Sequence, residues 1–288
     1  MSDFTFLTPE QCFGNDKLDI LKKRGTGAAI TDFSILLGGL VDRRSNYMHI
    51  DSDDSLAGRT GGYWTRSANS YGDVRMVLRD GRESECYGCF RDVGARPALL
   101  FSSISSIPTN GESGKRARDG VLEVEYGYYP QSAVTRGLQQ ELERQFTSGR
   151  LTKTGNGYTT DSRKNNAEDD EKFKAQRHEE YEYKGKRYIR VKANSCFFDG
   201  EDFKLSNGES YSNGDQVWVE VEPIKWLVSE RDKLMLAEKI IFAGVEFKRE
   251  RDYHTGDFWK TVIKQFIDYC WERDIEQVNK QVRSKRKN

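Results

Sequence analysis

The stretch at residues 61–99, where two short alternating runs are joined by Asp80-Gly81, constrains the fold more than any other part of the chain. In the first run, apolar residues at positions 74, 76 and 78 alternate with Arg75 and Arg79, which is the period of a half-buried strand. Asp-Gly between two such runs is a strong hairpin signal, because both residues readily adopt the turn conformation. We therefore predict an antiparallel hairpin, with a return strand toward Phe90, at the centre of a β-rich recognition fold.

The length, the charge balance and the cysteine content of the chain exclude several classes of protein. With 288 residues the chain can form one large domain or two modest ones with a substantial core. Because 46 Lys and Arg balance 46 Asp and Glu, no global field favours nucleic acid, an anionic membrane or an acidic substrate. There is no run of about 20 apolar residues, no secretion signal and no regular cysteine framework. The sequence therefore predicts a cytoplasmic protein with free thiols and without a membrane partner.

Apolar periodicity outlines the other elements. Helical spacing predicts four helices, over residues 16–23, 31–41, 135–147 and from 259 onward. In the last of these, Trp259 falls on the apolar stripe and Lys264 on the opposite side. Alternation predicts further strands, over residues 98–101, 121–126, 189–193, 217–222 and 226–228, the last two separated by Pro223. Residues 152–186 are poor in apolar side chains, which indicates an exposed insertion.

One segment is the best candidate for a boundary. Residues 102–120 are rich in Ser, Gly and charge and lack apolar periodicity, which is typical of a loop or linker. They separate a first half, residues 1–101, from a second half, residues 121–288.

Sequence blocks in both halves resemble a known family. The first half contains Tyr63-Trp64-Thr65-Arg66-Ser67 and Gly94-Ala95-Arg96-Pro97-Ala98-Leu99. The second half contains Gly127-Tyr128-Tyr129-Pro130-Gln131, Ile224-Lys225-Trp226-Leu227-Val228 and the apolar run at 234–241. Together they resemble a largely uncharacterised family of Firmicutes and phage proteins, whose core is similar to the sulfatase-modifying-factor branch of the C-type-lectin fold.

The resemblance implies a fold and an arrangement of the two halves. The fold would be α+β and C-type-lectin-like, as in the formylglycine-generating enzymes, with short twisted antiparallel strands and flanking helices. The two blocks stand in the reverse of the family's order, which we interpret as a circular permutation across residues 102–120. The halves would then pack as one composite domain with a shared sheet.

Five residues of these blocks are expected to be structural. A tryptophan in a short strand is more often part of the core than a stacking platform, which applies to Trp64 and Trp226. Arg66 and Arg96 are expected to fix loops through hydrogen bonds, with Pro97 beside them.

Cys86 and Cys89 have the spacing of a redox pair or of half a zinc site. Zinc needs a second ligand pair, which the sequence lacks, and a redox pair should open a helix, whereas these cysteines lie in a predicted hairpin arm. Structural thiols are therefore favoured, and no catalytic residue, metal or cofactor is predicted. The alternative is an oxidoreductase of the formylglycine-generating kind that uses Cys86 or Cys89 with a metal.

The hairpin also supplies the best candidate binding patch, which consists of Tyr71, Arg75, Arg79, Arg82 and Tyr87. Arg and Tyr are enriched at binding hot spots, and strand alternation should expose one face. We therefore expect a non-enzymatic recognition module that binds a protein partner, encoded by a bacterium or by its phage and then directed at a host factor.

A third hypothesis is nucleic-acid binding. Lys115, Arg116 and Arg118 in the linker, with the basic RSKRKN tail, would supply the positive charge. The zero net charge of the chain argues against this hypothesis.

Overall fold

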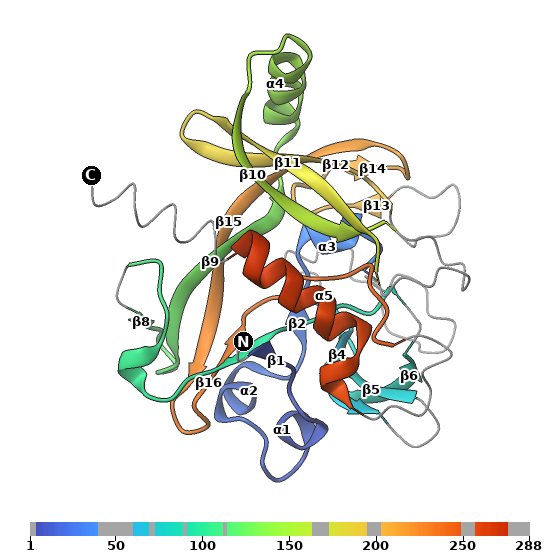
Figure 1. Cartoon of the computed structure of the whole chain (residues 1–288). Helices are drawn as coiled ribbons and strands as arrows, with labels where there is room; N and C mark the ends of the chain where they lie inside the picture. The colour runs from blue at the N-terminus through green and yellow to red at the C-terminus, as the bar shows by residue number, and fades with distance from the viewer. Residues whose placement is uncertain are drawn as a thin grey trace.

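A long pair of antiparallel strands forms the spine of the molecule (Figure 1). The computed structural model describes residues 4–39, 60–68, 73–88, 91–111, 114–162, 173–194, 203–248 and 257–275. Strand β15 (Gln216–Ser229) pairs along one edge with β9 (Leu122–Ala133) over most of its length. Val219 also pairs with β12 and Trp226 with β16, so these two strands share the other edge of β15.

The sheet forks along that second edge. One branch continues from β15 through β12 (Lys186–Lys192) and β11 (Ala175–Tyr183) to β10 (Thr152–Asp161). The other continues through β16 (Leu234–Ala237) and β7 (Ala98–Leu100) to β1 (Phe4–Thr5), while β8 (Lys115–Arg116) pairs with β9. Strands from before residue 102 and from after residue 120 therefore lie in one nine-stranded antiparallel sheet.

The remaining strands form three small sheets. These are β4 (Tyr63–Ala68), β5 (Asp73–Val77) and β6 (Glu83–Tyr87); β2 (Ala28–Ala29) and β3 (Thr60–Gly61); and β13 (Phe203–Lys204) and β14 (Ser210–Tyr211). The helices are α1 (Pro9–Phe13), α2 (Asp19–Arg24), α3 (Asp32–Leu36), α4 (Arg136–Thr147) and α5 (Val262–Cys270), with short turns η1 (Ile104–Ser106), η3 (Phe258–Lys260) and η4 (Trp271–Ile275). The fold is thus mixed α+β with mostly antiparallel strands. Within the described ranges, no helix is long and apolar enough to cross a membrane.

The two faces of the spine are covered by different layers. Val217 and Val219 of β15 belong to the main core, which α5 joins through contacts such as that between the rings of Phe266 and Phe242, 6.3 Å apart. Trp218, which points to the opposite face, is fully buried in a second cluster beneath α4 with Leu142. Burial on both faces explains why the first half of β15 is apolar without interruption at these positions.

Most predicted helices are confirmed, with shifted ends. Helix α4 matches the prediction over 135–147, and α5 with η4 matches the final helix. The helix predicted over 16–23 begins only at Asp19, and α1 was missed. Its signal was visible, because Thr8 and Gln11 form a reciprocal capping box around Pro9.

The prediction of an exposed insertion at 152–186 was wrong for the residues that the structure describes there. They form β10 and β11, and polar side chains on these strands are buried, including Glu180 and His178. Glu180 is satisfied by the hydroxyl of Tyr158, at 2.6 Å, and by Arg187, at 3.3 Å. Because these buried residues are polar, apolar periodicity could not reveal the strands.

Two further predictions fail near the end of the chain. Pro223 does not separate two strands, because it lies at a register irregularity inside continuous β15, where the Gln131 amide donates to its carbonyl at 2.8 Å. Trp259 is 53% exposed, whereas Lys264 is buried, with Nζ 4.9 Å from the Trp259 ring centre and paired with Asp268. The Lys264 ammonium is covered by the indole and by its pair with Asp268, while the indole itself is exposed.

The segment at 102–120 is part of the fold. It contains η1 and β8, and Asn110 occupies the outer edge of β9, where its backbone N–H donates to Glu125 and its side-chain oxygen accepts from Gly127. The described residues of this segment are therefore not a free linker.

Other polar side chains, buried Asp32 and half-buried Gln139, also bind backbone groups beside the large sheet. Asp32 accepts the backbone N–H groups of Ala133 and Ser206, each at 2.8 Å. Gln139 of α4 donates to the carbonyl of Gln216 and accepts from the N–H of Trp218, both at 2.8 Å. These side chains take the place of a neighbouring strand, so the backbone groups at these edges are satisfied within the molecule.

Candidate functional site

The predicted hairpin is confirmed. Strands β5 and β6 pair from Asp73 opposite Tyr87 to Val77 opposite Glu83, and Gly81 in the turn has a φ of 86°. This backbone conformation favours glycine, as the Asp-Gly signal required. Strand β4 pairs with the other edge of β5, so the candidate patch lies on a three-stranded sheet that is separate from the large one.

The hairpin tip is fixed against the core. A Cβ atom placed on Gly27 would lie 2.9 Å from the carbonyl oxygen of Arg79, so only glycine allows this close approach. Next to it, the Tyr63 hydroxyl donates to the carbonyl of Thr26 at 2.7 Å. The Asp80-Gly81 turn is therefore held in place by its close packing against residues 26 and 27.

Carboxylates of the same hairpin pair with two of the predicted binding arginines. Arg75 lies 3.2 Å from Glu83 and 3.4 Å from Glu85, and Arg82 lies 2.5 Å from Asp80. The Arg75 and Arg82 side chains are still 41% and 62% exposed. The described part of the patch thus presents the paired charges of Arg75 and Arg82, and Arg79 beside them is half-buried.

Other predicted site residues lie outside the described part. Tyr71 and Cys89 fall in ranges that the structure does not describe, as do the side chains of Cys86 and Tyr87. Among the described residues, no group of three or more His, Cys, Asp or Glu side chains is placed to hold a metal ion.

The two arginines and the proline that were predicted to be structural hydrogen-bond to other segments of the chain. Buried Arg96 donates to the carbonyls of Ala237, at 2.8 Å, and Thr26, at 3.4 Å, and Pro97 accepts from the N–H of Ala237. Arg66 donates to the hydroxyl of Thr5 at 3.1 Å.

The two tryptophans are both buried but differ in their polar atoms. Trp226 donates to the Tyr126 carbonyl at 2.9 Å, whereas Trp64 Nε1 has no hydrogen-bond partner among the described residues. Asp92 Oδ1 is the other enclosed side-chain atom without a partner in the described ranges, and burial raises the pKa of this carboxyl. In the described part of the chain, enclosed polar atoms without a partner thus occur on β4 and in the segment that follows β6.

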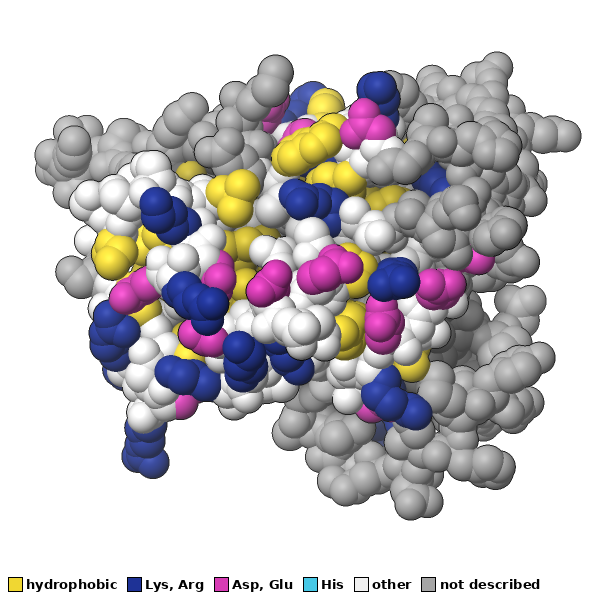
Figure 2. Space-filling model, turned by 90° about the horizontal axis from the view of Figure 1, so that it is seen from below, with side chains coloured by type: hydrophobic (Ala, Val, Ile, Leu, Met, Phe, Trp, Pro, Cys, Tyr) yellow, Lys and Arg dark blue, Asp and Glu magenta, His cyan; other side chains and the backbone are white. Residues whose placement is uncertain are grey.

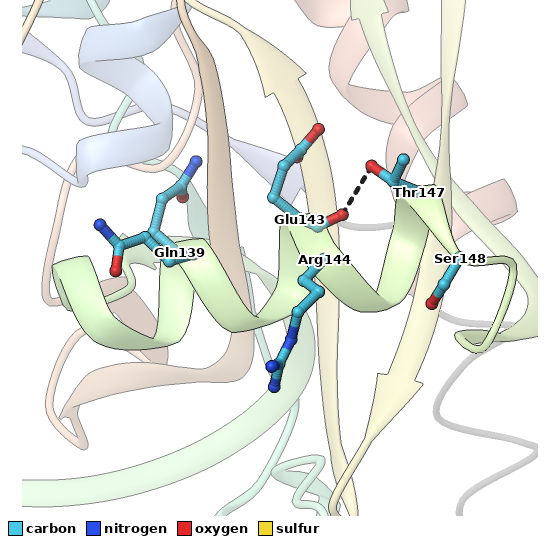
Figure 3. Close-up of a pocket in the computed structure, with 6 residues that line it drawn as sticks. Gln139, Glu143, Arg144, Thr147 and Ser148 are labelled. Atoms are coloured by element: carbon cyan, nitrogen blue, oxygen red, sulfur yellow. Dashed lines mark hydrogen bonds between the residues drawn. The ribbon is translucent and has the colours of Figure 1, made fainter.

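The hollow in Figure 3 lies along α4 and has a volume of about 590 Å³. Its lining comes from a single helix: Gln139, Gln140, Glu143, Arg144, Thr147 and Ser148. Glu143 is already engaged by Arg190, at 2.8 Å, and by the Trp218 indole, at 3.0 Å. No side chain here is set up as a nucleophile with an adjacent base.

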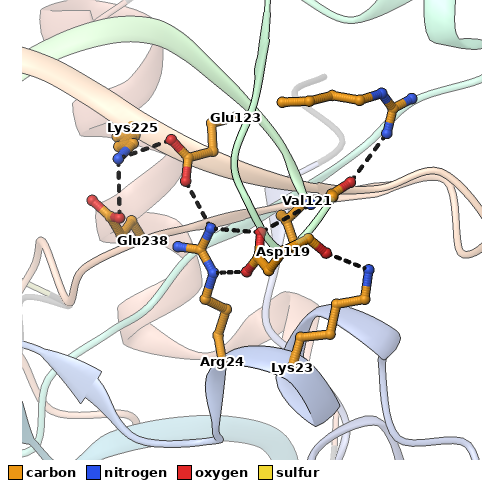
Figure 4. Close-up of polar contacts among 9 residues, drawn as sticks. Lys23, Arg24, Asp119, Val121, Glu123, Lys225 and Glu238 are labelled. Carbon is orange, nitrogen blue, oxygen red and sulfur yellow. Dashed lines mark hydrogen bonds and ion pairs between the residues drawn. The ribbon is translucent and has the colours of Figure 1, made fainter.

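A smaller pocket of about 210 Å³ lies where β15 passes from β12 to β16. Its polar lining includes Glu125, Glu222, Glu238, Lys225 and Lys239. Lys225 lies 3.0 Å from Glu123 and 3.3 Å from Glu238, so it belongs to the ion-pair network that Figure 4 shows. This pocket could not be predicted, because its walls come from strands far apart in the sequence.

The same network ties α2 to the turn between β8 and β9 (Figure 4). Arg24 forms a bidentate pair with Asp119 and also lies 2.9 Å from Glu123, while the Lys23 ammonium donates to the carbonyl of Asp119 at 3.0 Å. The hydrogen bonds from Arg24 lower the pKa of Asp119 to about 2. The segment that contains the basic residues predicted from the linker is therefore joined to α2 through Asp119.

No protein-family model, no curated protein and no solved structure matches this chain.

Proposed function

We propose that the chain is a non-enzymatic recognition module that binds another protein through the β4–β5–β6 sheet. One observation carries the proposal: this small sheet is anchored through Thr26, Gly27 and Arg96, yet it presents paired, exposed charges to solvent. Rigid scaffolds that present polar loops are typical of binding proteins, because little conformational entropy is lost on association.

The fold that we propose is C-type-lectin-like, in the sulfatase-modifying-factor branch and with its halves permuted. In support, β7 of the first half pairs with β16 of the second, and the Arg96-Pro97 block contacts Ala237. The partner class that the resemblance implies is a bacterial host protein, met inside the cell.

The charge pattern favours a protein partner over nucleic acid at this sheet. Arg75 and Arg82 are each neutralised by neighbouring carboxylates, so a phosphate backbone would meet Asp80, Glu83 and Glu85 as well. A protein surface with discrete charges can complement such alternation.

Site-specific photo-crosslinking tests the proposal. A photoreactive phenylalanine analogue is placed at Arg82 and, as a matched control, at Arg144 of α4, whose side chain is also exposed. In native cells we expect a discrete protein adduct from position 82 that is missing from position 144. No adduct at position 82, or the same adduct from both positions, would contradict the proposal.

Metal analysis tests the oxidoreductase alternative. Stoichiometric metal in the purified protein that is lost in the Cys86→Ser, Cys89→Ser double variant would replace our proposal with that alternative.

A further inference from the structure

Three segments far apart in the sequence meet at the corner of the molecule where α2, β8 and the β15–β16 turn lie together. Residues 17–25, 114–121 and 230–233, here called the basic corner, contain nine Lys and Arg but only four Asp and Glu. The whole chain has equal numbers of both. Figure 2, which views the molecule from below, shows Lys and Arg side chains gathered toward the left of that face, with acidic side chains among them.

Ion pairs between the segments hold the corner together. Arg24 of α2 pairs with Asp119, and Arg116 of β8 lies 2.5 Å from Glu230. Arg231 lies 3.7 Å from Asp19, which also pairs with Lys22 at 3.3 Å. Three of the four carboxylates, Asp19, Asp119 and Glu230, thus position four of the cations, and the pairs join all three segments.

Five of the nine cations form no ion pair with a described carboxylate. Of these five, Lys17 is half-buried and Lys23 donates to the carbonyl of Asp119. Within the described part of the chain, Lys115, Arg118 and Lys233 have no ion-pair partner, and all three residues are exposed. Because the three segments carry nine Lys and Arg but only four Asp and Glu, an anion placed here would reduce mutual repulsion as well as gain direct attraction.

We propose that the basic corner docks an acidic segment of a protein partner. This inference rests on the proposed function and adds to the β4–β5–β6 sheet, whose charges are paired, a second contact surface with an excess of positive charge. Duplex nucleic acid carries one charge per roughly 1.7 Å of its axis, so it would also press phosphates against Asp119 and Glu230. The corner has no aromatic side chain on which a base could stack, whereas separate carboxylates of a protein can match separate cations.

Binding of a fluorescent decaglutamate peptide to the full chain tests the proposal, with a 20-nucleotide single-stranded DNA as the competing probe. We expect the peptide to bind at low salt, to bind more tightly than the DNA, and to weaken as salt screens the charges. The triple variant Lys115→Glu, Arg118→Glu, Lys233→Glu should weaken peptide binding at least about tenfold. The neutral triple variant with Gln at these positions should show a smaller loss and guards against a folding defect.

A matched control separates the corner from net charge. The triple variant Arg136→Glu, Arg150→Glu, Lys184→Glu makes the same charge change around α4 and includes a lysine whose φ of 50° equals that of Lys233. It should bind the peptide within about twofold of wild type. Equal loss in both variants, no loss in the corner variant, or tighter binding of DNA would each overturn the proposal. The crosslink at Arg82 is unaffected by these outcomes, so the proposed function is tested separately.

Discussion

The nine-stranded sheet and the β4–β5–β6 sheet use their polar side chains in opposite ways. In the large sheet, buried Asp32 and Asn110 and half-buried Gln139 hydrogen-bond to backbone groups at the ends and edges of strands. In the small sheet, Arg75 and Arg82 pair with carboxylates at the solvent-exposed face. A buried group without its partner is costly, whereas an exposed pair is worth little, so the large sheet should depend on its polar residues far more.

The largest effect is expected for Asp32→Ala. It should lower the free energy of unfolding by roughly 4 kcal/mol, because the N–H groups of Ala133 and Ser206 lose a charged acceptor. Urea denaturation measures the change. Asp32→Asn, which keeps one acceptor, should lose clearly less; equal losses would show that the acceptor is not the cause.

Acid should weaken the same sheet through His178 of β11. Burial lowers the pKa of this side chain from 6.5 to about 4, so between these values the unfolded chain carries a proton that the folded chain lacks. Above pH 6.5 the neutral His178 does not reduce the free energy of unfolding. As pH falls from 6.5, the free energy of unfolding decreases, by up to about 3 kcal/mol near pH 4. Unfolding curves across this window should fall more steeply for wild type than for His178→Gln, and parallel curves would contradict the assignment.

The variant Gln139→Ala measures how much one polar side chain at the edge of β15 adds to the stability of the large sheet. Removal of its two bonds to Gln216 and Trp218 should cost roughly 2 kcal/mol in thermal or urea unfolding. Its neighbour Gln140, which lies exposed on the same helix, provides the control, and Gln140→Ala should change stability by less than about 0.5 kcal/mol.

The smallest effect is expected in the small sheet. Arg75→Ala should lower stability by about 0.5 kcal/mol or less, since its pairs with Glu83 and Glu85 are exposed. A double-mutant cycle with Glu83→Ala measures the coupling. A coupling near 2 kcal/mol would remove the distinction between the two sheets.

The parts of the fold that apolar pattern and turn chemistry determine could be predicted from the sequence. These include the hairpin at Asp80-Gly81, helix α4 and the final helix. Strands β10 and β11 could not be predicted, because their buried positions hold residues such as Glu180 and His178 whose partners lie on other strands. The basic corner could not be predicted either, because its three segments, α2, β8 and the β15–β16 turn, are distant in the sequence and come together only in the tertiary fold.

The candidate site was predictable to a similar degree. Alternation placed Arg75 on the exposed face of the hairpin, but the sequence alone did not reveal that Glu83 and Glu85 neutralise it. The anchoring of the turn by Gly27 also depends on a contact between distant segments.

The most direct test of the account is the yield of the position-82 adduct when the hairpin charges are exchanged. The triple variant Arg75→Glu, Glu83→Arg, Glu85→Arg keeps opposite charges facing each other and should unfold within about 1 kcal/mol of wild type. If the small sheet recognises a protein through its charge pattern, the adduct should nevertheless disappear. An undiminished adduct in this folded variant would contradict the central claim.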